Sequence, residues 1–254
     1  EATLAKAHQQ SLSGEISFGD LRGMVIALTV THPTILETTD AWLAAYPKSP
    51  YANALRAFQY RSIGWEIRGE ASARLTPLSS LQTFRSYLEA GMDHAQVAYE
   101  AGPDFAPASD AVMRLQIPTD RLNRRDYFGV VDHAMTVTPS VGTLLRAADI
   151  ANRHWGGRGH GDIIMLCDEY SGASPAMENF TKEICLAYLT YAIASMTDDE
   201  EQWAWDQLNG QYDPILTFAL INRILSTSGA VAVSEEELAH VIDHYKSSVD
   251  SRRA

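Results

Sequence analysis

The sequence lacks the features that mark membrane-spanning and disordered proteins. It has no uninterrupted apolar run of about 20 residues, the length that spans a bilayer. The richest apolar stretch, 184–196, is shorter and is interrupted by Thr190 and Ser195. Charged residues make up 20% of the chain and apolar residues 46%, a balance that supplies a hydrophobic core. We therefore expect an ordered protein that is not integral to a membrane.

Cysteine is also scarce, with only Cys167 and Cys185 in 254 residues. Each stands in an apolar pattern with helical spacing, which is typical of a small buried side chain. Two such residues provide no disulfide framework, so we expect free thiols in a reducing compartment. The sequence therefore favours a cytoplasmic location.

Basic residues are outnumbered, because 20 Lys and Arg stand against 32 Asp and Glu, for a formal net charge of −12. An acidic surface repels the phosphates of nucleic acids, so we expect no DNA or RNA partner. The chain has no Gly-x-Ser-x-Gly nucleophile motif, and neither cysteine has the glycine-rich surroundings of a reactive thiolate. We predict no catalytic residue, no cofactor and no enzymatic activity.

Helix-start signals recur along the whole chain. Some pair a hydroxyl with an acid three residues later, which is the spacing of a capping box. Others place proline directly after a capping serine or threonine. The capping boxes begin at Ser17, Thr34, Thr197 and Ser234, and the proline starts are Ser49-Pro50, Thr76-Pro77 and Ser174-Pro175.

Between these starts the apolar residues recur at spacings of three and four, and no segment alternates as a strand does. This pattern predicts an all-α protein with short connections. We expect Pro118 to end one helix, since proline disfavours helical backbone before it. The predicted helices span 2–12, 18–30, 33–46, 50–67, 77–101, 106–116, 123–137, 140–154, 162–170, 175–196, 198–208, 212–227 and 235–250.

A weak internal repeat appears where prolines follow predicted helices. Trp42, Ala98 and Ala134 each stand five residues before a proline, at positions 47, 103 and 139. The last two prolines are 36 residues apart, close to the tetratricopeptide period of about 34. We expect the proline to end the second helix of a hairpin while the residue one turn earlier packs against a neighbouring helix.

Two segments carry a resemblance to the tetratricopeptide family. Residues 95–104 (AQVAYEAGPD) look like the end of a second repeat helix, and residues 132–139 (DHAMTVTP) repeat it. The series Trp42…PKSP, GWEIRG at 64–69 and HWGG at 154–157 is similar to a bacterial domain family of unknown function with degenerate tetratricopeptide-like helices. The signature of the first repeat helix, with tryptophan, Leu-Gly and tyrosine at fixed offsets, is missing. Groove residues of the family are therefore not carried over.

The resemblance covers about residues 30–195 and implies an α-solenoid of antiparallel helical hairpins that acts as an interaction module. We accordingly predict a single helical-repeat domain over 1–254, with a tetratricopeptide-like array at 1–196 and C-terminal capping helices at 197–254.

Arginines and aromatics cluster at two places in this acidic chain. Arg56, Arg61 and Arg68 share a predicted helix with Tyr60 and Trp65, and Arg121, Arg124 and Arg125 precede Tyr127. Such a surface suits a carboxylate-bearing peptide or partner loop. The alternative is a solvated face beside core aromatics. The candidate partner-binding residues here are Arg61, Trp65, Arg68, Arg124 and Tyr127.

The segment 152–162 (NRHWGGRGHGD) is unusually rich in glycine. Successive backbone N–H groups and arginines in such a loop could hold an anion or an acidic peptide, so His154, Trp155 and Arg158 are further candidate partner-binding residues. The alternative is a plain turn in which Gly156 ends one helix and Asp162 caps the next. No Lys-Ser/Thr follows the glycines, which excludes a nucleotide-binding P-loop.

Metal binding is the other chemistry that this segment suggests. His154, His160, Asp162, Asp168 and Glu169 are residue types that bind zinc or iron. Their spacing follows no known pattern, so we predict no metal ligand. A metal-assisted enzyme centred on the 154–162 loop is the alternative function.

The main functional expectation is a helical-repeat module that binds a protein or peptide. A sharper form is an immunity or accessory protein of a bacterial toxin or secretion system, since a small acidic scaffold suits a basic partner. A purely architectural role as an oligomeric scaffold is a third hypothesis.

Overall fold

All regular structure in the described part of the chain is helical. The computed structural model describes residues 1–69, 75–152, 159–178, 180–182, 185–186 and 189, and no strand occurs among them. This confirms the predicted all-α class. No helix in these ranges has the length and apolar character needed to cross a membrane.

The helices follow the predicted ranges closely as far as α7. The elements are α1 (Ala2–Leu12), α2 (Phe18–Ala27), α3 (Pro33–Ala45), α4 (Pro50–Arg68), α5 (Leu78–Ala101), α6 (Ala106–Thr119), α7 (Arg124–Val137), α8 (Val141–Ala148), the 3₁₀ turn η1 (Asp149–Ala151), α9 (His160–Tyr170) and the 3₁₀ turn η3 (Pro175–Met177). The helix predicted over 140–154 is shorter and ends in η1, and the one predicted from 175 begins with only the short turn η3. The helices predicted at 198–208, 212–227 and 235–250 lie outside the described residues.

Two of the predicted helix starts are confirmed by their hydrogen bonds. Ser17 and Asp20 form a reciprocal capping box at α2. The Ser49 hydroxyl accepts from the Ala52 N–H ahead of Pro50. In each case a side-chain oxygen satisfies one of the N–H groups that a helix leaves without an internal partner.

Two other predicted caps are wrong, and a third is confirmed only in its position. The cap of α3 is His32 rather than Thr34, because the His32 Nδ1 atom accepts from the Thr34 N–H. Pro77 rather than Thr76 occupies the cap position of α5, whereas Ser174 stands at the cap position of the 3₁₀ turn η3 with Pro175 directly after it, but makes no side-chain capping bond. The capping boxes at Thr197 and Ser234 lie outside the described residues.

Pro118 does not end its helix, contrary to expectation. It lies inside the last turn of α6, which continues to Thr119. A proline there removes only one helical hydrogen bond, at an end where few remain. The helix stops instead at Asp120, whose φ of 49° places it in the left-handed region.

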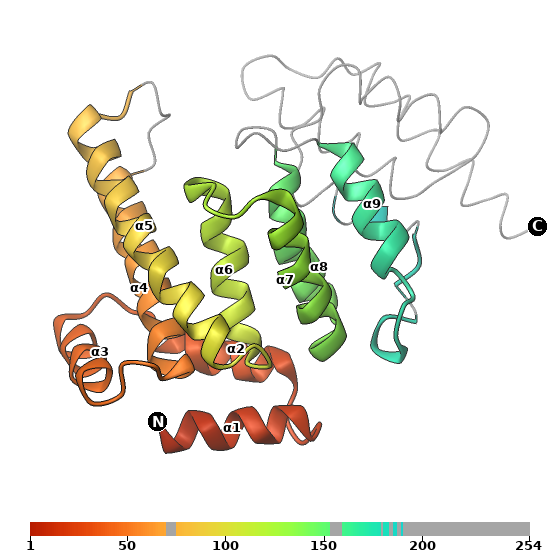
Figure 1. Cartoon of the computed structure of the whole chain (residues 1–254), viewed down its shortest axis with the longest axis horizontal. Helices are drawn as coiled ribbons and strands as arrows, with labels where there is room; N and C mark the ends of the chain where they lie inside the picture. Colours follow the sequence, from red (N-terminus) through yellow and green to blue (C-terminus); the bar gives the residue numbers. More distant parts are fainter. Residues whose placement is uncertain (70–74, 153–158, 179, 183–184, 187–188, 190–254) are drawn as a thin grey trace, which may run out of the picture. The chain divides into compact units, whose positions relative to one another are not determined.

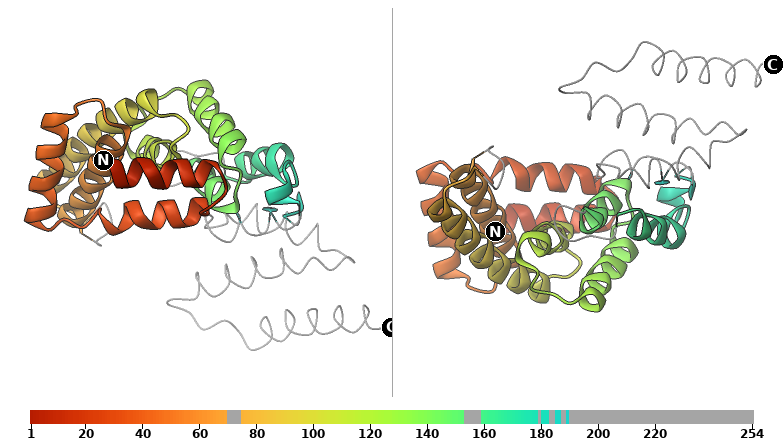
Figure 2. Two further views of the ribbon diagram at one scale, coloured as in Figure 1. Left: turned by 90° about the horizontal axis from the view of Figure 1, so that it is seen from below. Right: turned by 90° about the horizontal axis from the view of Figure 1, so that it is seen from above.

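The chain divides into two compact units, 1–147 and 148–254. Within the first unit α1 and α2 lie side by side and run across the ends of α4, α5 and α6 (Figures 1 and 2). Their shared core consists of Leu4, Ala7, Leu21, Val25, Ala54, Ala98, Phe105 and Ala108. Small residues on α4, α5 and α6 thus leave room for the branched side chains of α1 and α2.

His8 fixes α1 to this core through two polar contacts. Its Nδ1 atom lies 3.2 Å from the Tyr51 hydroxyl, and its Nε2 atom lies 3.0 Å from the Asp104 carbonyl oxygen. One neutral tautomer satisfies both, because Nε2–H can donate to the carbonyl while Nδ1 accepts from the hydroxyl. The buried histidine therefore has a structural role.

The helices α4 and α5 pair in opposite directions. Near the start of α5, Phe84 packs edge-on against Trp65 from the end of α4, with ring centroids 5.0 Å apart. Near the end of α5, His94 Nδ1–H donates to the Asn53 amide oxygen of early α4 at 2.7 Å. Burial lowers the pKa of His94, and the neighbouring Arg56 lowers it further. The neutral imidazole therefore suits this contact.

Three helix ends share one geometry. The first N–H beyond α3, α5 and α7 donates to the carbonyl oxygen of Trp42, Ala98 or Ala134, respectively. A proline then follows two residues after the last helical residue in each case, at positions 47, 103 and 139. The five-residue spacing between each of these residues and its proline therefore marks three helix ends that share the same geometry. Ala98 and Ala134 are buried, as expected.

In the second unit, α9 carries one half of a disulfide. Cys167 is bonded to Cys185, with the two Cα atoms 5.6 Å apart. The expectation of two free, separately buried thiols is therefore wrong. The error arose because 18 residues separate the cysteines and apolar spacing does not reveal pairing. A structural disulfide is typical of proteins that mature in oxidising compartments.

We predict that the unreduced, denatured protein contains no reactive thiol. Thiol titration in denaturant should give two thiols per chain after reduction and none before it. Peptide mapping should recover Cys167 and Cys185 in one linked fragment. Two free thiols in protein purified under oxidising conditions would contradict the pairing.

The turn between α5 and α6 provides a sharp test of the packing in the first unit. A methyl group at Gly102 would lie 2.8 Å from the Pro50 Cβ atom, whereas one at Gly129 would meet nothing within 4 Å. We expect Gly102→Ala to lower the free energy of unfolding by about 1–3 kcal/mol through overpacking. We expect Gly129→Ala, inside α7, to raise it by about 0.5–1 kcal/mol.

Urea unfolding followed by circular dichroism measures both changes. The pair is matched, because each variant adds one methyl group to the first unit. Equal effects of the two substitutions would show that α5 does not end against Pro50 as described.

Candidate functional site

Three of the predicted partner-binding residues meet at the end of α4. The guanidinium carbon of Arg61 lies 5.9 Å from the Trp65 ring centroid, and that of Arg68 lies 5.1 Å from it. Both distances are within the range of a cation–π contact. Trp65 itself is half-buried, with Phe84 of α5 against its edge. The helix thus places two guanidinium groups within reach of one indole ring.

Large apolar side chains are exposed at the same end of the α4–α5 hairpin. Ile67 follows Trp65 on α4 and is 36% exposed, while Leu75 and Leu78 precede and begin α5 and are 78% and 71% exposed. Burying such side chains against a partner would stabilise a complex by the hydrophobic effect. We call Arg61, Trp65, Ile67, Arg68, Leu75 and Leu78 the hairpin-end surface.

The predicted pair on α7 behaves differently. The Arg124 guanidinium carbon lies 4.9 Å from the Phe128 ring centroid, at a half-buried position. Tyr127 is 0% exposed, and its hydroxyl donates to the Ala147 carbonyl oxygen at 2.8 Å. That carbonyl belongs to the last turn of α8, where helix carbonyls need outside donors. Tyr127 is therefore a core residue, and its prediction as a partner contact is corrected.

The glycine-rich segment is only partly within the described residues. His154, Trp155 and Arg158 lie outside them. Gly159 precedes α9 with a φ of 61°, a conformation that favours glycine, and no side chain caps the helix. Asp162 is buried in the first turn of α9 rather than at the cap position. In the described part of the chain, no three His, Cys, Asp or Glu side chains are grouped as metal ligands would be.

A pocket of about 320 Å³ lies within the first unit and was not predicted. It is lined by residues of α2, α4, α6 and α8 and by the segment after α2. Among its described lining residues, Arg22, Arg61, Arg114 and Arg146 are cationic and Asp110 is acidic. All four arginines are half-buried. Val25, Ile26, Phe58 and Pro107 supply the apolar wall.

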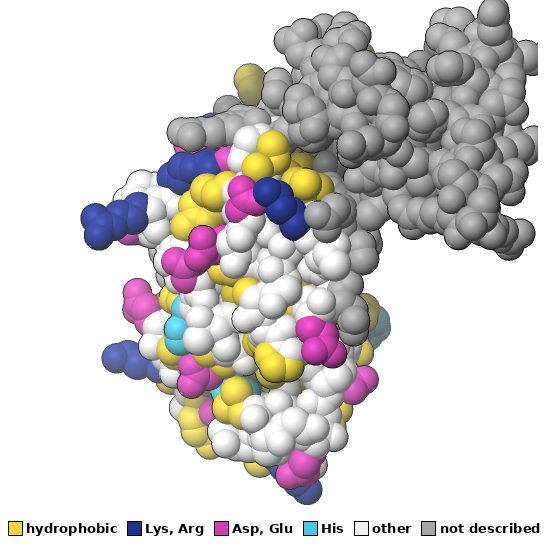
Figure 3. Space-filling view, turned by 90° about the vertical axis from the view of Figure 1, so that its right-hand side faces the viewer, with side chains coloured by type: hydrophobic (Ala, Val, Ile, Leu, Met, Phe, Trp, Pro, Cys, Tyr) yellow, Lys and Arg dark blue, Asp and Glu magenta, His cyan; other side chains and the backbone are white. Residues whose placement is uncertain are grey.

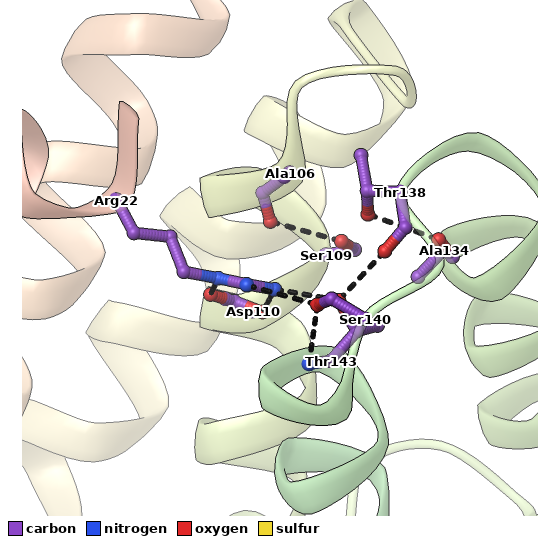
Figure 4. A network of polar contacts seen from close by, with 8 residues as sticks. All are labelled: Arg22, Ala106, Ser109, Asp110, Ala134, Thr138, Ser140 and Thr143. Atoms are coloured by element: carbon purple, nitrogen blue, oxygen red, sulfur yellow. Dashed lines mark hydrogen bonds and ion pairs between the residues drawn. The ribbon is translucent and has the colours of Figure 1, made fainter. Parts of the chain in front are cut away.

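Arg22 and Asp110 form an ion pair at the edge of this pocket (Figure 4). Arg22 Nε donates to one carboxylate oxygen, and Nη2 donates to the other at 3.0 Å. The side chain of Arg22 is 15% exposed and that of Asp110 is 5% exposed. The fork geometry satisfies both carboxylate oxygens, which a buried carboxylate requires.

The same guanidinium reaches the start of α8. Arg22 Nη2 lies 2.7 Å from the Thr143 hydroxyl, and Nη1 lies 3.4 Å from the Ser140 hydroxyl. The Thr143 hydroxyl donates its hydrogen to the Thr138 carbonyl oxygen at 2.9 Å. The Ser140 hydroxyl must therefore donate to Thr143 across their 3.0 Å contact. Arg22 of α2 is thus hydrogen-bonded to α6 and to the start of α8.

Gly142 leaves room for this arrangement. A methyl group there would lie 3.2 Å from Nη1 of Arg22, closer than an ordinary van der Waals contact. The glycine also lines the pocket. The absence of a side chain at position 142 therefore leaves room for the guanidinium beside the cavity.

The gathering of arginines in the pocket contrasts with the face of the molecule drawn in Figure 3. On the face drawn in Figure 3, the charged side chains of the described residues are scattered among uncharged ones, and no large patch of one sign is visible. Four of the chain's 20 Lys and Arg residues line this one cavity, although the whole chain carries a net charge of −12. Several arginines of this acidic protein are therefore gathered around one cavity.

Few features of the sequence indicated this pocket. Arg61 was a candidate because aromatic residues surround it on its own helix. Arg22 and Asp110 are 88 residues apart, and nothing beside either one in the sequence indicates the pairing. The available signal was weaker: Asp110 lies within a run of buried residues on α6, where an acid needs a partner.

A double-mutant cycle tests the Arg22–Asp110 pair. We expect Arg22→Met and Asp110→Leu each to lower the free energy of unfolding by about 3–5 kcal/mol, because each leaves a buried charge without its partner. The double variant should lose less stability than the sum of the two single losses.

The exposed pair Arg121–Asp93, with side chains 39% and 65% exposed, serves as a control. Arg121→Met should cost roughly 0–1 kcal/mol. Additive effects at Arg22 and Asp110 would show that the pair is not coupled.

In comparisons with protein-family models, with curated proteins and with solved structures, the chain matches none of them. The evidence for its function therefore comes from its own side chains.

Proposed function

We propose that this chain is a helical-repeat module that binds a protein or peptide partner through the hairpin-end surface. The observation that carries the proposal is the contact of Trp65 with both Arg61 and Arg68 beside exposed Ile67, Leu75 and Leu78. Tryptophan and arginine are the residues most enriched among those that dominate binding energy in protein interfaces. Exposed leucines around them would complete an apolar contact area.

The arginines indicate what the partner supplies at this surface. Arg68 lies over the Trp65 ring and donates one N–H to the Gly69 carbonyl oxygen, and a guanidinium in this position can donate further N–H groups from its edge to a carboxylate. The partner segment should therefore carry an acidic side chain next to an apolar one. Binding of this kind needs no metal ion and should survive chelation.

The matching ends of α3, α5 and α7 support the repeat part of the proposal. Each of these helices ends with the same backbone hydrogen bond and the same proline offset, and each leads into the following helix. A tetratricopeptide-like solenoid would be built from such hairpins. The three ends are unevenly spaced along the chain, so the array we propose is an irregular one.

The net charge of −12 favours a basic partner for the rest of the surface. Because of this charge, the more specific version of our proposal is an immunity or accessory protein of a bacterial toxin or secretion system. The alternative, a metal-assisted enzyme centred on residues 154–162, has no supporting observation among the described residues of that segment.

Affinity capture with matched variants tests the proposed surface. We expect the wild-type chain to retain a protein from a lysate of its source cells that Trp65→Ala and Arg68→Gln do not retain. With the captured protein identified by mass spectrometry and purified, Trp65→Ala should weaken binding by roughly 30-fold or more, the loss of about 2 kcal/mol typical of a dominant interface residue. Isothermal titration calorimetry measures the affinity of each variant, and a titration with EDTA tests whether binding needs a metal ion.

Arg85→Gln is the control, because Arg85 is an exposed arginine of α5 outside the hairpin-end surface and its loss changes the net charge equally. This variant should bind within about twofold of wild type. A partner that binds the Trp65 and Arg68 variants as tightly as the wild type would contradict the proposed surface. Unfolding midpoints of all variants show whether each one is folded.

A further inference from the structure

The chain's two cysteines both belong to the second unit. Cys167 lies in α9, and Cys185, its disulfide partner, follows 18 residues later. The first unit, residues 1–147, contains no cysteine. A change in the oxidation state of these sulfurs therefore alters the covalent structure of the second unit and leaves that of the first unit unchanged.

The regular structure beside this disulfide is short. Helix α9 has 11 residues, and no side chain caps its first turn. An isolated helix shorter than about 12–15 residues is marginal in water, because few hydrogen bonds repay the cost of nucleation. In residues 171–178, which follow α9, the only regular structure is the three-residue turn η3. Neither α9 nor η3 therefore holds its conformation without support from another segment.

Two described contacts connect α9 to the segment around Cys185, and the disulfide is the stronger of them. Lys182 forms an ion pair with Asp168, but the two side chains are 50% and 51% exposed, and a pair this exposed contributes little. A disulfide across a loop of this length favours the folded form by roughly 100-fold, because it restricts the unfolded chain. Order in α9 and η3 should therefore depend on the bond.

The bond is also shielded from thiols in solution. Cys167 and Cys185 are each 0% exposed. Reduction requires a thiolate to reach one of the two sulfurs and to attack it along the bond. A reductant can therefore act only when this part of the second unit opens locally.

We infer that this disulfide is a redox-dependent clasp. Helix α9 and the turn η3 are ordered when Cys167 and Cys185 are oxidised, and they lose that order on reduction. The first unit, with the hairpin-end surface, stays folded in both states. The complete fold therefore requires an oxidising environment.

A low-molecular-weight disulfide, such as oxidised glutathione, is the oxidant. One cysteine thiolate attacks it and releases one glutathione thiolate, which leaves a mixed disulfide on the protein. The second cysteine thiolate then displaces the other glutathione. Two protein thiols and one oxidised glutathione thus give one protein disulfide and two reduced glutathione molecules.

Hydrogen–deuterium exchange of the full chain tests the clasp. We expect the amides of α9 to exchange at least about tenfold faster in chain refolded with excess dithiothreitol than in chain refolded with oxidised glutathione. The amides of α4, α5 and α6 should exchange within about twofold in the two samples, and they show that the first unit is folded in each.

The double variant Cys167→Ala with Cys185→Ala is the matched control. It keeps two small apolar side chains and removes the covalent link. In this variant α9 should exchange as fast as in the reduced wild type, with or without dithiothreitol. This comparison separates the effect of the bond from the packing of the two side chains.

The rate of thiol release tests the shielding. Dithiothreitol should release the two thiols at least about tenfold more slowly from the native chain than from chain unfolded in guanidinium, because only locally open molecules react. Equal rates would show that the bond is not shielded.

Equal exchange of α9 in the oxidised, reduced and doubly substituted chains would overturn the inference. Faster exchange of α4, α5 and α6 after reduction would also contradict it, because the effect would then not be confined to the second unit. These tests substitute no residue of the hairpin-end surface, so their outcome is independent of partner capture.

Discussion

The ion pair between Arg22 and Asp110 is the constraint on which the first unit depends. It joins α2, which lies across the ends of α4–α6, to the middle of α6, and the same guanidinium bonds the start of α8. Apolar packing alone would allow α1 and α2 to shift along the small residues beneath them, since hydrophobic contacts are not directional. A buried fork of hydrogen bonds permits only one register. The position of α2, and with it one wall of the pocket, follows from this pair.

The two candidate surfaces are connected through α4. Arg61 lines the pocket, and it also lies over the ring of Trp65 one turn later in the helix. The pocket depends on residues from distant parts of the sequence, whereas the hairpin-end surface comes from one hairpin. Arg61 therefore belongs both to the lining of the pocket and to the hairpin-end surface.

Sequence patterns predicted the local features well and the distant contacts poorly. The ranges of α1 and α4, the capping box at Ser17 and the serine-proline start at Ser49 follow from interactions within a few residues. Arg61, Trp65 and Arg68 could be grouped because they share one helix face. Tyr127 was misjudged because a tyrosine beside arginines looks the same whether it points outward or inward. The Cys167–Cys185 bond and the Arg22–Asp110 pair join segments 18 and 88 residues apart, so no local pattern contains them.

Hydrogen–deuterium exchange of Asp110→Asn against wild type tests the role of this ion pair most directly. Asparagine keeps the shape of the side chain and removes the charge that orients Arg22. Because Arg22 bonds both elements at once, the account predicts faster exchange in α2 and at the start of α8 together, with α4 and α5 unchanged at their centres. Unchanged exchange in α2 and α8 would show that the fold does not depend on this pair.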